Sequence, residues 1–165
     1  MPSIYIHIPF CKQACHYCDF HFSTSLAKKE QLIAALKKEM VLRKEEFKDE
    51  IVATIYFGGG TPSLLETSEI NELINVVYSN YQVAENPEIT LEANPDDLTM
   101  EKLKELSKCL INRLSIGVHS FFDEDLTFMT RALNALEAGV SIREALREFD
   151  YFCLVLRVWR SVWRR

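Results

Sequence analysis

The sequence predicts an α/β fold in which about four βα units form a parallel sheet, and three observations lead to this prediction. Short β-branched, apolar segments alternate with longer segments whose apolar residues recur at helical spacing. The connections between these segments are short, as in βα units. The chain has 165 residues, 48% of them apolar and 26% charged, which is the composition of one domain that can bury a core.

The first expected unit begins with a strand at Ser3–Ile8, which is β-branched and aromatic. A cysteine-rich loop follows this strand and extends to about Phe22. Ser25 is the expected N-cap of the first helix, because a serine before an apolar periodic segment is a helix-start signal. The apolar face of that helix comprises Ile33, Leu36, Met40 and Phe47.

The second expected unit begins with a buried strand at Ile51–Phe57. This strand ends at the glycine-rich segment Gly58–Pro62, whose residues are strong breakers of regular structure. Thr67 or Ser68 is expected to start the second helix. The apolar residues at helical spacing are Ile70, Leu73, Ile74, Val77 and Tyr81.

The third and fourth expected units follow the same order. A strand is predicted at Glu88–Ala93, and Thr99 is the expected cap of a helix that shows Leu103, Leu106 and Leu110 on one face. Arg113–Val118 predicts the fourth strand, and helical sequence follows over residues 123–147. The four units together predict a single sheet with helices between its strands.

Composition and charge exclude several classes of protein. No apolar run approaches the roughly 18 to 20 residues that a membrane span needs. A net charge of -5 is opposite to the basic footprint of a nucleic-acid-binding protein. The N-terminus shows no basic region or cleavage site of a secretory signal. We therefore expect a cytoplasmic protein whose five cysteines are metal ligands or buried thiols rather than disulfides.

An unusual cluster of residues follows each of the four expected strands. The cysteines follow the first strand, the glycines the second, Glu92–Pro95 the third and Gly117–Ser120 the fourth. The carboxyl ends of parallel strands lie at one edge of a sheet, where α/β proteins place their functional loops. The sequence therefore predicts a functional site at this edge.

Cys11, Cys15 and Cys18 form the motif C-x3-C-x2-C. Thiolates are soft ligands that suit zinc, copper(I) and iron–sulfur clusters. Four-iron clusters ordinarily use four cysteines, so that three would leave one iron open to a small molecule. A zinc site completed by His16 or His21, or a redox pair of Cys15 and Cys18, are the alternatives.

The segment IYIHIPFC with this cysteine motif resembles the radical S-adenosylmethionine (SAM) superfamily. IYFGGGTPSLL, ITLEANPDDLT and INRLSIGVHSFFDEDL are similar to the branch that contains oxygen-independent coproporphyrinogen III oxidases and HemW-type heme chaperones. The resemblance covers residues 3 to about 150 and implies part of a (β/α) radical SAM barrel. It implies that the three cysteines hold a [4Fe–4S] cluster whose fourth iron is chelated by SAM, which reduction cleaves to a 5′-deoxyadenosyl radical.

The resemblance also implies a set of SAM-contacting residues in this chain. They are Tyr5, Tyr17, Gly59, Gly60, Thr61, Glu92, His119 and Arg131. Considered without the family, the glycine triplet is about equally often a tight turn, Glu92 is a helix-capping or salt-bridged acid, and Arg131 is a solvated helix charge. The family usually has Gln at the position of His119. His7 is expected to satisfy a hydrogen bond in the core, and Cys109 and Cys153 to be unliganded thiols.

The function that the resemblance implies is that of a heme chaperone, which binds heme as cargo and transfers it to heme-acceptor proteins. The oxidase typically carries a further cysteine two residues after the third ligand, where this chain has Phe20. This difference favours the chaperone over an enzyme, and no catalytic residue is assigned. The alternatives are an oxidase that oxidatively decarboxylates propionate side chains, and an inactive fragment or zinc-binding module.

Residues 151–165 differ in character from the rest of the chain. They contain four arginines, no acid and both tryptophans. Because the whole chain carries -5 and this tail +4, residues 1–150 carry -9. We interpret the tail as out-of-frame sequence after a frameshift; the alternative is an amphipathic tail that caps a shortened sheet and contacts a membrane surface.

The family pattern continues beyond residue 150 with a fifth strand that carries a SAM-contacting Asp. Leu156 stands at about that position in this chain. The remaining barrel strands and the C-terminal domain of the family are absent from the sequence. Residues 1–150 are therefore expected to form the N-terminal part of a truncated radical SAM core domain.

Overall fold

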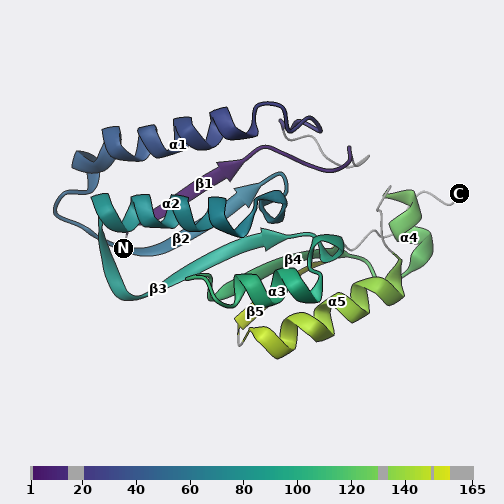
Figure 1. Cartoon of the computed structure of the whole chain (residues 1–165). Coiled ribbons are helices and arrows are strands. Elements are labelled where there is room, and N and C mark those ends of the chain that lie inside the picture. Colours follow the sequence, from purple (N-terminus) through teal and green to yellow (C-terminus); the bar gives the residue numbers. More distant parts are fainter. Residues whose placement is uncertain (1, 15–20, 130–133, 150, 157–165) are drawn as a thin grey trace, which may run out of the picture.

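Strands and helices alternate along the chain in the computed structural model, which describes residues 2–14, 21–129, 134–149 and 151–156 (Figure 1). The strands are β1 (Ser3–Ile8), β2 (Ile51–Gly59), β3 (Gln82–Ala93), β4 (Arg113–His119) and β5 (Tyr151–Leu156). The α-helices are α1 (Lys29–Arg43), α2 (Thr67–Asn80), α3 (Met100–Leu106), α4 (Asp123–Phe128) and α5 (Ala135–Glu148). Three short 3-10 helices are η1 (Lys44–Phe47), η2 (Pro62–Leu64) and η3 (Pro95–Asp97).

The five strands form one sheet in the order β1-β2-β3-β4-β5, and every neighbouring pair is parallel. The predicted α/β fold with parallel strands is therefore confirmed. All the carboxyl ends lie at the same edge of the sheet, which we call the carboxyl edge. The sheet has one strand more than the four expected from the sequence.

The additional strand, β5, comes from the first six residues of the basic tail. It pairs with β4 from Arg113–Tyr151 to His119–Leu156. Phe152 and Leu154 pack against the core, whereas the side chain of Tyr151 is 71% exposed. Phe152 and Leu154 are two residues apart and lie on the same face of the strand, which is partly buried. Residues 157–165, which include both tryptophans, lie outside the described residues.

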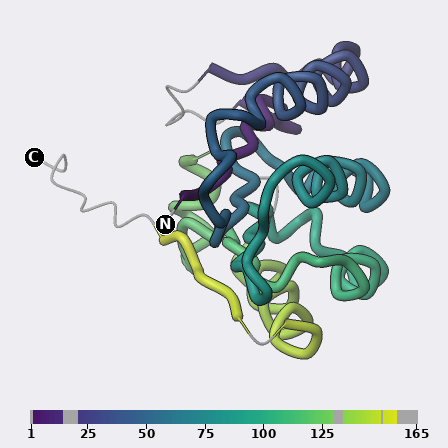
Figure 2. Tube along the Cα trace, turned by 90° about the vertical axis from the view of Figure 1, so that its left-hand side faces the viewer, coloured from purple at the N-terminus to yellow at the C-terminus, as the bar shows by residue number. Residues whose placement is uncertain are grey.

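Helices α1, α2, α3 and α5 lie on one side of the sheet, as Figure 2 shows. The strand residues that face them are buried and apolar, for example Ile6, Ile55, Leu91 and Ile116. These residues pack with helix residues such as Leu73 in one core cluster. The side chains between them on each strand point to the opposite face, which we call the inner face.

The helix starts differ in part from those expected. Thr99 caps α3 as predicted, by accepting a hydrogen bond from the Lys102 N–H at 3.2 Å. Ser25 is not the cap of α1, because its hydroxyl instead accepts from the Ala27 N–H at 3.4 Å in a turn before the helix. Glu66 caps α2 through a capping box with Glu69.

The helical sequence expected over residues 123–147 is divided between two helices. Helix α4 ends at Phe128, and α5 begins after Asn134. Asn134 caps α5 by accepting a hydrogen bond from the Glu137 N–H at 2.9 Å, and the Glu137 carboxylate accepts from the Asn134 N–H. A strong N-cap of this kind starts a new helix within a segment whose periodicity is continuous. In the described part of the chain, every helix is too short or too polar to cross a membrane.

Candidate functional site

The cysteine-rich loop and the glycine-rich loop lie against each other at the carboxyl edge. The Gly60 N–H donates a hydrogen bond to the Ile8 carbonyl at 2.8 Å, and the Thr61 N–H donates to the Phe10 carbonyl at 2.6 Å. These bonds continue the parallel pairing of β1 and β2 beyond the ends of both strands. Cys11, the first cysteine of the motif, is thereby brought next to Gly60.

The glycines are required because neighbouring groups occupy the space that side chains would fill. A Cβ on Gly60 would lie 2.5 Å from the Phe10 carbonyl oxygen and 2.9 Å from Cys11 Sγ. A Cβ on Gly59 would lie 2.7 Å from the ring of His7, and its φ of +116° disfavours any L-residue. The glycine segment therefore lets β1 and the cysteine loop approach β2 closely, whether or not a ligand is bound.

Glu92, near the end of β3, has both carboxylate oxygens fixed by groups of β2. The Tyr56 hydroxyl donates to Oε1 at 2.7 Å, and the Gly59 N–H donates to Oε2 at 3.2 Å. Each carboxylate oxygen has two acceptor positions, so one on each remains for a further donor. Glu92 is thus a preoriented acceptor at the carboxyl edge.

Two tyrosines lie beside Glu92 on the inner face. Tyr5 stacks on Tyr56 with ring centroids 5.9 Å apart and an angle of 17° between the planes. Burial and the hydrogen bond to Glu92 raise the pKa of Tyr56 to about 12. Burial and the charge of Glu92 also raise the pKa of Tyr5 above its ordinary value. Both phenols are therefore neutral at physiological pH.

His7 lies beside Tyr5 and is not a core histidine. Its side chain is exposed on the inner face, and Nδ1 is 3.3 Å from the Tyr5 hydroxyl oxygen. The expectation that His7 satisfies a hydrogen bond in the core is wrong, because β1 buries its even-numbered neighbours Ile6 and Ile8 instead. The His7 imidazole therefore lies on the same face of the sheet as the Tyr5 ring.

A polar network joins the glycine-rich loop to the loop that follows β3. The Asn94 side-chain amide donates to Thr61 Oγ1 at 3.2 Å, and its backbone N–H donates to Ser63 Oγ at 3.2 Å. Ser63 Oγ in turn donates to Asp97 Oδ2 at 2.6 Å. Ser63 and Thr61 are each only 4% exposed, so this network is shielded from water.

His119 lies at the end of β4 in a left-handed backbone conformation with φ of 68°. This conformation is uncommon for a residue other than glycine. A Cβ on Gly117 would lie 3.1 Å from His119 Nε2, so the glycine makes room for the ring. In the sheet register His119 lies opposite Leu156 of β5, so two of the positions at which the chain departs from the family pattern are neighbours.

The structure therefore places the described site residues at one edge of the sheet. The Gly59 N–H donates to Glu92, Tyr5 is linked to Glu92 through Tyr56, and Cys11 lies against Gly60. Thr61 is joined to the loop after β3, and His119 lies on the neighbouring strand β4. Four of the predicted site residues lie outside the described residues: Cys15, Tyr17, Cys18 and Arg131.

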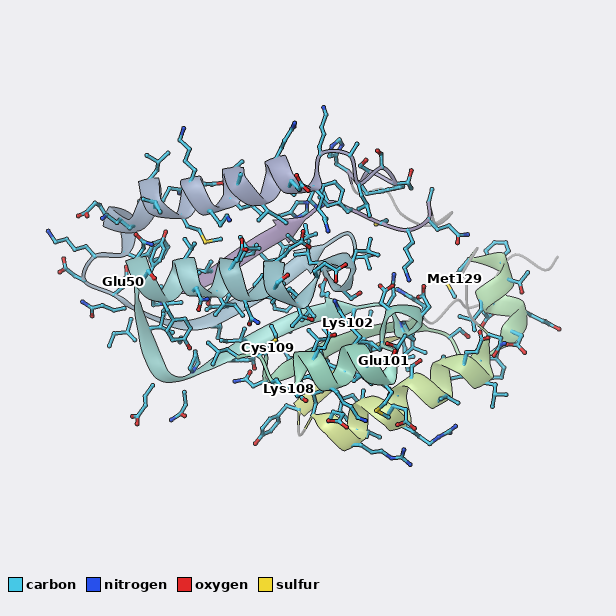
Figure 3. All side chains as sticks on the ribbon, viewed as in Figure 1. Glu50, Glu101, Lys102, Lys108, Cys109 and Met129 are labelled. Atoms are coloured by element: carbon cyan, nitrogen blue, oxygen red, sulfur yellow. The ribbon has the colours of Figure 1, made fainter. Side chains whose placement is uncertain are left out.

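The two cysteines outside the motif lie in different parts of the molecule. Cys109 lies near the C-terminal end of α3, toward the amino ends of the strands (Figure 3). It is therefore remote from the carboxyl edge, which Met129 marks in the same view. The Cys109 thiol donates to the Glu105 carbonyl at 3.3 Å, and burial raises the pKa of this thiol. Cys153 lies on β5 opposite Ser115.

Tyr56, Lys12 and Asp97 belong to the site but are not singled out by the sequence analysis. The signal for Tyr56 is its position between Ile55 and Phe57, since alternation along a strand turns it to the face opposite the core. Lys12 and Asp97 form an ion pair. They come from loops that lie far apart in the sequence, and no local pattern indicates that they meet.

Comparisons with known proteins agree with the fold and the position of the motifs. The sequence model of the radical SAM superfamily matches residues 5–154. The heme chaperone HemW of Bacillus subtilis is 36% identical over 153 residues, which are 92% of this chain and 40% of that protein. The oxygen-independent coproporphyrinogen III oxidase of Escherichia coli is 34% identical over 124 residues, which are 74% of this chain and 27% of that protein.

The solved structure of coproporphyrinogen III oxidase from Escherichia coli, described as a radical SAM enzyme, superposes with a TM-score of 0.84. It is 29% identical to this chain and matches 93% of it, but only 36% of the oxidase. The chain thus spans about 40% of the length of the HemW relative that it matches. Because the family match extends from β1 into β5 and covers most of the sequence, the chain belongs to the radical SAM superfamily.

Proposed function

We propose that Cys11, Cys15 and Cys18 bind a [4Fe–4S] cluster. Three thiolates in one loop form a soft donor set that suits iron–sulfur clusters. The position of Cys11 fits this role, because its sulfur lies at the carboxyl edge and Gly60 provides space beside it. Family membership supports the same assignment, since the superfamily is defined by radical chemistry on SAM. When bound, the cluster supplies an electron for reductive cleavage of SAM.

We further propose that SAM binds beside Cys11, against the groups of β2, β3 and β4 at the carboxyl edge. Glu92 offers two fixed acceptor oxygens to hydroxyl or ammonium donors of the ligand. Tyr5 presents a ring that is 57% exposed, and His119 presents a ring at the end of β4. The backbone of the glycine-rich loop approaches SAM closely at Gly59, Gly60 and Thr61. Tyr17 and Arg131 complete the proposed set of SAM-contacting residues.

The function that we propose for the complete protein is that of a heme chaperone, which binds heme and passes it to acceptor proteins. The observation that carries this choice is Phe20, which stands where the oxidase pattern has a further cysteine. The 36% identity to the HemW relative also supports it. Heme-contacting residues are not assigned, because the chain spans about 40% of that relative.

The experiment uses the complete protein that contains this sequence, reconstituted with iron and sulfide without oxygen. Its two readouts are heme titration followed by absorbance, and consumption of coproporphyrinogen III in the presence of SAM and a reductant. The chaperone proposal expects saturable heme binding without decarboxylation of coproporphyrinogen. Turnover of coproporphyrinogen would instead establish the oxidase, and a colourless protein with stoichiometric zinc would establish a zinc-binding module.

A further inference from the structure

An ion pair connects the cysteine-rich loop to the loop after β3. Lys12, the residue after Cys11, places Nζ 3.2 Å from Asp96 Oδ2 and also pairs with Asp97. The Asp97 side chain is only 5% exposed, whereas that of Lys12 is 46% exposed. The lysine therefore reaches from the cysteine loop to a carboxylate that is embedded in the neighbouring loop.

Asp97 is also hydrogen-bonded to a buried side chain of the site. The Ser63 hydroxyl donates to Asp97 Oδ2 at 2.6 Å, and Ser63 Oγ accepts from the Asn94 N–H. The carboxylate thus has a buried donor on one side and the Lys12 ammonium on the other. Through these contacts the ion pair joins three loops at the carboxyl edge: the cysteine loop, the glycine-rich loop and the loop after β3.

The base of the cysteine loop has its own backbone restraints. The Cys11 N–H donates to the Ser23 carbonyl at 3.0 Å, and the Ser23 N–H donates to the Pro9 carbonyl at 2.8 Å. These bonds hold the two ends of the loop together but do not connect it to β3. The contact of Lys12 with Asp97 makes that connection, one residue away from the Cys11 ligand.

We propose that Asp97 is a positioning residue, which acts through Lys12 to fix the Cys11 end of the cysteine loop relative to the loop after β3, which carries Asn94. The proposal rests on the proposed function, because it supposes that Cys11 is a cluster ligand. A cluster and a SAM molecule that are held by two different loops require those loops to be fixed relative to each other to well within 1 Å. An exposed ion pair alone contributes little to stability. Here the Asp97 carboxylate is embedded and hydrogen-bonded, which keeps it in one geometry.

The first test follows backbone hydrogen exchange in the chain without metal. Asp97→Asn keeps the size of the side chain and an acceptor for Ser63 but removes the embedded one of the two carboxylate charges that Lys12 contacts. We expect the peptide over residues 9–14 to exchange about fivefold faster in Asp97→Asn and in Lys12→Ala, as loss of a pair of ordinary strength implies. Lys12→Arg, which keeps the charge, should restore slow exchange.

Lys37→Ala is the matched control. Lys37 pairs with Glu72 at 2.8 Å between α1 and α2, at a similar side-chain exposure of 36%. This variant removes a surface ion pair whose acid, Glu72, is 58% exposed, without touching the carboxyl edge. Unchanged exchange over residues 9–14 in both Asp97→Asn and Lys12→Ala, or equal acceleration in Lys37→Ala, would overturn the proposal.

The second test measures iron retention after anaerobic reconstitution, as the rate at which a chelator removes iron. We expect about fivefold faster loss from Asp97→Asn than from the wild-type chain or from Lys12→Arg. If the wild-type chain binds iron and the variants retain it equally, the positioning role is wrong while the cluster assignment stands. If the wild-type chain binds no iron, the cluster assignment fails, and the exchange result alone decides whether Asp97 fixes the loop.

Discussion

At the scale of single residues, one of the two groups that orient Glu92 is a hydroxyl from the neighbouring strand, and the other is the Gly59 N–H. Tyr56 donates to Glu92 at 2.7 Å, while its ring stacks on Tyr5. Hydrogen bonds to charged groups are stronger than those between neutral groups. Tyr56 is therefore expected to influence ligand binding through Glu92.

Tyr56→Phe removes this hydroxyl and keeps the ring. We expect the dissociation constant for SAM, measured by equilibrium dialysis of the iron-reconstituted chain, to rise roughly tenfold, as loss of a charge-assisted hydrogen bond implies. Tyr81→Phe is the control, because the Tyr81 hydroxyl donates to the Met40 carbonyl at 2.7 Å on the helix side of the sheet. Equal SAM affinity in both variants would contradict this role of Tyr56.

The pKa of Tyr56 leads to a prediction at alkaline pH. The phenol titrates at 10.0 when unperturbed, and burial with the Glu92 hydrogen bond raises its pKa to about 12. Because the folded state holds this proton more tightly, the stability that the neutral phenol contributes is complete below pH 10 and is lost as the pH rises toward 12. A tyrosinate absorbance titration of the chain minus that of Tyr56→Phe should show one late-titrating phenol. A difference curve centred near 10 would be inconsistent with the partly buried hydrogen bond from Tyr56 to Glu92.

At the scale of elements, the glycine-rich loop has a structural role that is separate from any ligand. Gly60→Ala would place a methyl group 2.5 Å from the Phe10 carbonyl and 2.9 Å from Cys11 Sγ. We expect this substitution to destabilise the fold by about 1–3 kcal/mol, as overpacking does, and to reduce iron loading through displacement of Cys11. Urea unfolding and iron analysis measure the two effects.

Gly139→Ala is the matched control for that substitution. Gly139 lies within α5, where an added Cβ would meet only Arg143 Nη1 at 3.7 Å. Alanine is the better helix former, so this variant should be more stable by about 0.5–1 kcal/mol. A Gly60→Ala chain as stable as the wild type, with full iron loading, would show that the two loops do not meet as described.

Strand β5 also supports a prediction, because it comes from the segment whose charge differs from that of the rest of the chain. Phe152 packs against the core, whereas Tyr151 is 71% exposed. Phe152→Ala should therefore lower the free energy of unfolding by about 1–3 kcal/mol. Tyr151→Ala should change it by less than about 0.5 kcal/mol. Denaturant unfolding of the pair tests the strand, and equal values would argue against its pairing with β4.

The elements that the sequence predicts best are those with a local signal. Ser3–Ile8 forms β1 as expected, and Thr99 caps α3. The start of β3 lies six residues before the expected Glu88, because Gln82 and Val83 pair with β2 across a register irregularity that no local pattern reveals. The division between α4 and α5 was likewise hidden by continuous periodicity, although Asn134 and Glu137 form a recognisable capping box.

At the scale of the whole molecule, the site is assembled from four strands whose carboxyl ends meet at one edge. Sequence order and the rule for parallel sheets suffice to place Cys11, Gly60, Glu92 and His119 at that edge. Contacts between them depend on tertiary packing, so the sequence alone does not indicate that Tyr56 orients Glu92. The same holds for the meeting of Lys12 with Asp97, whose positions are 85 residues apart in sequence numbering.

The central claim is that this edge holds an iron–sulfur cluster with SAM beside it. The most direct measurement is electron paramagnetic resonance of the anaerobically reconstituted and reduced chain, recorded without and with SAM. We expect about four iron atoms per chain, as in a [4Fe–4S] centre, and a signal that changes when SAM is added. Cys11→Ser should abolish this signal and Cys109→Ser should leave it intact. A chain that binds only zinc, or a signal that SAM does not alter, would contradict the claim.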